Sequence, residues 1–235
     1  FAWEKFRLAS FRGGIHWVTN RLTLLDITGE FYGGKVEGGA QFDFAPDGNA
    51  AYRFRARFTE ANLNRLIADL AEPTNKLEGT FTGLLDITAA NTANFTNWQG
   101  TGNVALTNGL LWNFPLFGLF SPVLNAIIPG LGNSRAKDAT ATFLITNSVI
   151  HTRDLEIRSP PVRLHYDGTV GFDGRVKARV EAELFRDAFL IGRVISLLTT
   201  PLTKVFEYKV SGTLTEPKSE PVFFLAKLIL FPLRP

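Results

Sequence analysis

The stretch Tyr52-Arg53-Phe54-Arg55-Ala56-Arg57-Phe58 alternates strictly between apolar residues and arginine. Successive side chains of a β-strand point to opposite faces of the sheet. A strand over residues 52–58 therefore has one aromatic face and one cationic face. This pattern is typical of an antiparallel sheet that is packed on one side and hydrated on the other.

The same alternation recurs along the chain. It is clearest in Val176-Lys177-Ala178-Arg179-Val180-Glu181-Ala182-Glu183-Leu184, and shorter examples occupy residues 40–44, 155–157 and 162–166. The turn sequences Pro46-Asp47-Gly48-Asn49, Asp173-Gly174 and Asn108-Gly109 lie between alternating segments and predict hairpins. The sequence therefore predicts a mainly β fold, built as an antiparallel meander of many strands.

Two or three short amphipathic helices are expected beside the strands. Thr59 is the predicted N-cap of a helix that carries Leu63, Leu66, Ile67 and Leu70 and ends before Pro73. A second helix is expected at residues 189–199. A third candidate lies at residues 114–131, where prolines permit only short helical turns.

Charge is distributed unevenly. The 235 residues include 25 Lys and Arg and 22 Asp and Glu, and a net charge of +3 is too small to indicate nucleic-acid binding. Residues 87–134 contain no charged residue at all. We expect this segment to contact a membrane or to plug a groove through its large apolar residues, which are Leu116, Phe117, Phe120, Leu124, Ile127 and Ile128.

The sequence contains no pattern typical of a catalytic site. There is no Cys, the three histidines are isolated, and nucleophile-elbow, phosphate-loop and zinc-protease motifs are absent. We therefore predict no enzyme activity, no metal and no cofactor. Arg53, Arg55 and Arg57 could bind an anionic head group, but a hydrated strand face is the favoured interpretation.

The apolar faces of the strands need a cover that a few short helices cannot supply. Either two sheets close on each other as a sandwich, or one sheet curls around something apolar such as lipid. The residues expected to line such a lipid-binding groove are Phe42, Phe44, Phe54, Phe58, Val104, Leu106, Phe143, Ile145, Val176, Val180 and Leu184.

Several segments in order resemble the C-terminal region of AsmA-like proteins. They are Gly79-Thr80-Phe81-Thr82-Gly83-Leu84-Leu85-Asp86-Ile87, residues 98–111, the Phe-Pro-Leu-Phe stretch from Phe114, and residues 141–150, 155–160, 167–172 and 210–217. Each motif consists mostly of Gly, Asn and aliphatic residues, so the resemblance rests on their order. It covers roughly residues 60–220.

The resemblance implies an envelope protein of Gram-negative-type bacteria that is anchored in the inner membrane and projects through the periplasm. It implies a long curved β-sheet, folded like a taco around an apolar groove, that conducts phospholipids toward the outer membrane. Residues 1–235 are then one module of a longer protein, with preceding strands and a short helix at 1–75, the core match at 76–220 and an apolar tail at 221–235. The alternative is a scaffold that assembles outer-membrane proteins by strand addition.

Overall fold

A computed structural model describes residues 2–3, 6–7, 9–70, 78–109, 138–159, 162–184 and 204–222. Its elements are, in chain order, β1 (Ala2–Trp3), β2 (Phe6–Arg7), β3 (Ala9–Val18), β4 (Arg21–Phe31), β5 (Gly34–Phe44), β6 (Ala50–Asn62), α1 (Leu63–Leu70), β7 (Thr80–Asn91), β8 (Asn94–Thr107), β9 (Asp138–Thr146), β10 (Val149–Ser159), β11 (Val162–Gly171), β12 (Val176–Leu184), β13 (Lys204–Gly212) and β14 (Pro217–Pro221).

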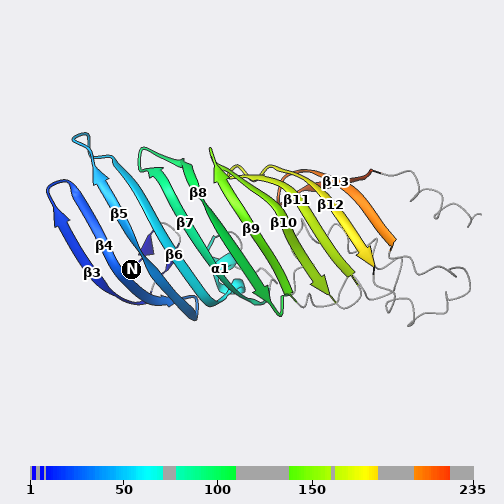
Figure 1. The fold of residues 1–235 in the computed structure, drawn as a ribbon, viewed down its shortest axis with the longest axis horizontal. Coiled ribbons are helices and arrows are strands. Elements are labelled where there is room, and N and C mark those ends of the chain that lie inside the picture. Colours follow the sequence, from blue (N-terminus) through cyan, green and yellow to red (C-terminus); the bar gives the residue numbers. More distant parts are fainter. Residues whose placement is uncertain are drawn as a thin grey trace, which may run out of the picture.

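Twelve strands form one sheet in which spatial order follows sequence order from β3 to β14. Every neighbouring pair is antiparallel. Figure 1 shows the strands side by side in a curved sheet that does not close on itself. The predicted mainly β, antiparallel meander is thus confirmed, and β3 and β14 form the edges of the described sheet.

Two of the three predicted hairpin turns are confirmed. Gly48 (φ 85°) and Gly174 (φ 80°) adopt the left-handed conformation that tight turns require. The carboxylates of Asp47 and Asp173 accept hydrogen bonds from the backbone N–H two residues later, each at 3.0 Å. The prediction for Asn108-Gly109 is wrong, because β8 ends at Thr107 and β9 begins only at Asp138.

The first predicted helix is confirmed as α1, but its predicted cap is wrong. β6 continues through Thr59 to Asn62, and the Asn62 side chain accepts a 3.0 Å hydrogen bond from the backbone N–H of Arg65. The expected helices at 189–199 and 114–131 lie outside the described residues, as does the tail beyond Val222. No helix in the described ranges has the length and hydropathy needed to cross a membrane.

Close approaches between neighbouring strands explain two glycines in strand interiors. A Cβ atom built on Gly38 would lie 2.0 Å from the carbonyl oxygen of Arg55, and one on Gly168 would lie 2.4 Å from that of Lys177. Separations this short are forbidden for any side chain. Glycine therefore permits a bend in the sheet at both positions, which other residues would oppose.

Candidate functional site: the apolar face of the sheet

Strand register places apolar residues in one continuous row across the sheet. Residues paired across neighbouring strands project to the same side. Starting at Ile15 and following the pairs, the row reads Ile15, Leu24, Ala40, Phe54, Ile87, Gly100, Ile145, Ile150, Val170 and Val176. All ten members are apolar or glycine, one from each strand from β3 to β12. We call the side of the sheet that carries this row the apolar face.

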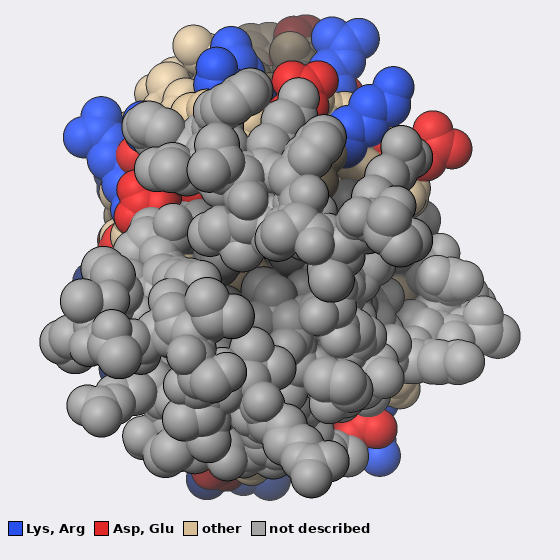
Figure 2. All heavy atoms as spheres, turned by 90° about the vertical axis from the view of Figure 1, so that its right-hand side faces the viewer, with Lys and Arg blue, Asp and Glu red and all other residues tan. Residues whose placement is uncertain are grey.

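The opposite side is polar, and we call it the charged face. One of its rows reads Arg55, Asp86, Thr101, Leu144, His151, Thr169 and Lys177. Ion pairs join neighbouring strands on this side, including Arg163 with Glu183 and Arg179 with Glu207. Seen end-on, charged side chains project from the outline of the molecule (Figure 2).

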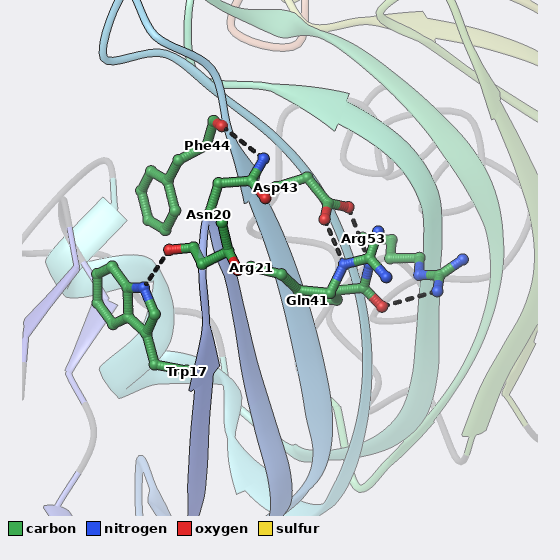
Figure 3. Close-up of polar contacts among 8 residues, drawn as sticks. Trp17, Asn20, Arg21, Gln41, Asp43, Phe44 and Arg53 are labelled. Atoms are coloured by element: carbon green, nitrogen blue, oxygen red, sulfur yellow. Dashed lines mark hydrogen bonds and ion pairs between the residues drawn. The ribbon is translucent and has the colours of Figure 1, made fainter.

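A chain of hydrogen bonds crosses β4, β5 and β6 on the charged face (Figure 3). Arg21 Nε and Gln41 Nε2 donate to the two oxygens of Asp43 at 2.5 and 2.8 Å, and Arg53 Nη2 donates to Gln41 Oε1 at 2.8 Å. The hydrogen bonds from Arg21 and Gln41 lower the pKa of Asp43. Arg55 Nε lies 3.9 Å from Asp86. Two of the three arginines in the alternating stretch thus contact polar groups of their own sheet.

Aromatic rings gather on the apolar face near the short hairpin turns. Trp17 stacks on Phe44, with ring centroids 5.5 Å apart (Figure 3). Phe42 and Tyr52 stack at 5.6 Å, and the Nε1 of Trp98 donates a 2.8 Å hydrogen bond to the Tyr52 hydroxyl. Burial raises the pKa of that hydroxyl. The rings thus form a row from β3 to β8, and the indole of Trp98 meets Tyr52 across the intervening β7.

Contacts between more distant strands extend this row. The ring of Trp98, on β8, lies edge-on to Phe172 with centroids 5.9 Å apart. Phe172 follows β11, and two strands, β9 and β10, separate β8 from β11 in the sheet. In a flat sheet, strands lie about 4.8 Å apart, so residues three strands apart would be about 14 Å from each other. The two side chains therefore reach toward each other over β9 and β10, as they do on the inner side of a curved sheet.

A second group of side chains forms a packed core toward the C-terminal edge. Val162, Leu164, Tyr166, Val180 and Val210 are each buried and belong to one hydrophobic cluster. Leu164 and Val180 are both 0% exposed. Burial raises the pKa of the Tyr166 hydroxyl well above its ordinary value. On these strands the side chains of the apolar face form a hydrophobic core.

The predicted groove residues share the apolar face but differ in accessibility. Phe42, Phe44, Phe54, Phe58, Val104 and Phe143 are partly buried, whereas Leu106, Ile145, Val176 and Val180 are buried. Leu184 of β12 is paired with Val162 of β11, but the structure does not describe the Leu184 side chain. The predicted plug or membrane-contact residues, from Leu116 to Ile128, also lie outside the described residues.

The most exposed apolar side chains of this face were missed by sequence reasoning. Ile15 and Trp17 of β3 are 68% and 61% exposed. The segment Ala9–Val18 alternates only from Phe11 to Trp17, and the pair Gly13-Gly14 leaves the middle of that stretch without side chains. Its only sequence signal is the short apolar and aromatic run around His16.

Neither a metal centre nor a known relative marks this site. Within the described residues, no group of three His, Asp or Glu side chains is placed to hold a metal ion. No family model, no curated protein and no solved structure matches the chain.

Proposed function

We propose that this protein is a β-groove module that binds phospholipids and conducts them between the inner and outer membranes of a bacterial envelope. The observation that carries the proposal is the apolar row from Ile15 to Val176, which no polar residue interrupts over ten strands. A soluble domain that needed only a core would not require such a continuous row in an unclosed sheet.

Curvature supports placing the ligand on the apolar face. The contacts of Trp98 with Tyr52 and with Phe172 bring side chains of non-neighbouring strands together on that face, as bending toward it would. An acyl chain lying along the row gains about 0.8 kcal/mol for each methylene removed from water. The polar head group remains at the open side of the sheet. Successive positions are chemically alike, so a chain can slide between them without a large barrier.

Accessibility supports contact with the ligand at the β3 end of the face. Ile15 and Trp17 are largely exposed, whereas Val180 is fully buried. A ligand can therefore reach the first two side chains without rearrangement of the core. Trp17 has an apolar ring and an Nε1 that already donates to the carbonyl oxygen of Thr19 at 3.1 Å, so a hydrocarbon chain at its ring leaves no polar group unpaired.

Lipid capture by the purified chain tests the proposal. After incubation with phosphatidylethanolamine and phosphatidylglycerol vesicles, native mass spectrometry should detect protein with bound phospholipid. Ile15→Asp should reduce the bound fraction severalfold, because it places a charge on the exposed part of the apolar face. Val18→Asp is the matched control, since Val18 lies on the same strand, is 53% exposed and is paired with Arg21 on the charged face. Failure to bind supplied phospholipid, or equal loss in both variants, would refute the proposal.

The cellular setting rests on the resemblance of residues 60–220 to AsmA-like proteins. From it we propose that the module lies in the periplasm, as part of a longer protein anchored in the inner membrane. Fractionation of cells that express the full-length gene product should recover it with the inner membrane and leave this module accessible to a protease added to the periplasm. Recovery in the cytosol would contradict this placement.

A second candidate function is assembly of outer-membrane proteins by strand addition. The outer edge of β3 favours it, because that edge has no partner among the described strands and such an edge can accept a strand from another chain. This function predicts that an outer-membrane protein co-purifies with the chain and that Ile15→Asp leaves the association intact. Lipid capture without such a partner would favour the groove.

A further inference from the structure

The outer edge of β3 is the most exposed strand surface in the described sheet. All ten residues of β3 are exposed, and its one partner among the described strands is β4. In an antiparallel pair, alternate residues direct their N–H and C=O groups away from the partner strand. About half of the backbone groups of β3 therefore face outward, ready to pair with another strand.

Natural sheets protect such edges with charges, prolines, bulges or very short strands. β3 has ten residues, no proline and no lysine, and its charged residue is Arg12. Its one bulge lies at its start, between Ala9 and Arg12, where Ser10 has a φ of 51°. Exposed apolar side chains lie on both of its faces, since Ile15 and Trp17 belong to the apolar face and Val18 to the charged face. An edge with these properties is suited to pairing with a further strand.

The sequence of β3 is complementary to itself in the antiparallel direction. With Gly14 opposite Gly14 of a second copy, Phe11 lies opposite Trp17 and Gly13 lies opposite Ile15, while Arg12 lies opposite His16. Phe11 then meets Trp17 on the apolar face, and Arg12 meets His16 on the charged face. This register aligns every residue from Phe11 to Trp17, which follow the bulge at Ser10, and the glycines at its centre allow close approach.

We infer that the open edge of β3 binds β3 of a second copy of this chain, in antiparallel register about a two-fold axis at Gly14. The axis runs perpendicular to the sheet, so it leaves both apolar faces on the same side. The two apolar faces then meet where each Ile15 lies opposite Gly13 of the other copy, and they form one surface spanning both copies. The interaction is isologous, so it closes at two copies and leaves each β14 edge outside the interface.

Cysteine cross-linking tests the register directly, because the chain contains no Cys of its own. Gly14→Cys places two thiols opposite each other at the axis, where paired strands have Cα atoms about 4.5–5.5 Å apart, within the range that a disulfide spans. A Cβ at Gly14 would meet Leu25 Cβ at an unstrained 3.6 Å. Under mild oxidation we expect Gly14→Cys to form a disulfide-linked dimer at micromolar concentration.

Leu144→Cys is the control, because Leu144 is exposed like Gly14 but lies on the interior strand β9. It should remain monomeric under the same conditions. Equal dimer yields from Gly14→Cys and Leu144→Cys, or no dimer from Gly14→Cys, would overturn the inference.

Charge changes at His16 supply a second, reversible test that leaves the apolar face untouched. In the proposed register each His16 faces Arg12 of the other copy. His16→Glu should tighten the dimer severalfold through two cross-strand ion pairs, and His16→Lys should weaken it by a similar factor. Sedimentation velocity over a range of concentrations measures the dimer dissociation constant of each variant. A monomer at all concentrations, or equal effects of the two substitutions, would refute the pairing without bearing on phospholipid binding.

Discussion

At the β3 end of the apolar face Ile15 and Trp17 are 68% and 61% exposed, whereas on β11 and β12 Leu164 and Val180 are both 0% exposed. The two regions follow the same rule of strand alternation and lie on the same side of one sheet. One region offers apolar side chains to solvent, and the other uses them as core.

The comparison shows that alternation identifies a face without identifying its use. An exposed apolar residue contributes little to folding and is available to a ligand, whereas a buried one stabilises the fold by about 1.5–3 kcal/mol. The same apolar-to-aspartate substitution should therefore lower the stability of the fold at the buried end and lower ligand binding at the exposed end.

A charge at the buried end should have the largest effect. Val180→Asp is expected to lower the free energy of unfolding by about 4 kcal/mol or more, because it buries an unpaired carboxylate among Leu164, Tyr166 and Val210. Ile15→Asp should change it by about 0.5 kcal/mol or less. Urea unfolding measures both, with Lys177→Asp as the control on the charged face of β12. Comparable losses for Val180→Asp and Ile15→Asp would show that the two ends do not differ in their role.

Replacing glycine by alanine should cost more stability on an interior strand than on the edge strand β3. Gly38→Ala should cost about 2 kcal/mol, because its Cβ would collide with the carbonyl oxygen of Arg55 and force β5 and β6 apart. Gly14→Ala, on β3, meets no atom closer than 3.6 Å and should be neutral within about 0.5 kcal/mol. Urea unfolding again measures the difference. A neutral Gly38→Ala would mean that the bend does not depend on glycine.

Much of this sheet could be predicted from local sequence. The stretch from Tyr52 to Phe58 obeys the two-residue period without interruption, and it forms the central part of β6 with the expected faces. The turns at Gly48 and Gly174 were predictable because their conformation is one that glycine adopts without strain. The opposite charges of the outer rows, such as Arg163 beside Glu183, follow from the same period.

Other features depend on information that local sequence does not carry. β3 escaped prediction because the pair Gly13-Gly14 leaves the middle of its alternating stretch without side chains. The cap of α1 was misplaced because β6 extends to Asn62, and strand pairing with β7 decides that length. Burial along the apolar face depends on contacts between distant strands, which is why Val180 and Ile15 look equivalent in sequence.

Substituting Trp98 should cost more stability than substituting Trp17, because the hydrogen bond of Trp98 is the less exposed of the two. Trp98→Phe removes the 2.8 Å hydrogen bond to the partly buried Tyr52 hydroxyl and should cost about 1 kcal/mol. Trp17→Phe removes a hydrogen bond to Thr19 at an exposed position, where water can replace it, and should cost about half as much or less. Thermal unfolding of both variants provides the comparison, and the reverse order would contradict it.

The smallest effect is expected on the charged face beside the exposed end, at Asp43. Hydrogen bonds from Arg21 and Gln41 lower its pKa below the ordinary value of 3.8. A carboxyl group with a lower pKa in the folded state stabilises the fold above its unfolded pKa, and this contribution is lost as the pH falls through the folded value. Asp43→Asn should therefore be slightly less stable than the parent chain at pH 7, and the difference should shrink below about pH 4. Urea midpoints measured at pH 7, 5 and 3 test this dependence. A difference that persists at pH 3 would mean that packing around Asp43, and not its charge, supports the β4 to β6 region.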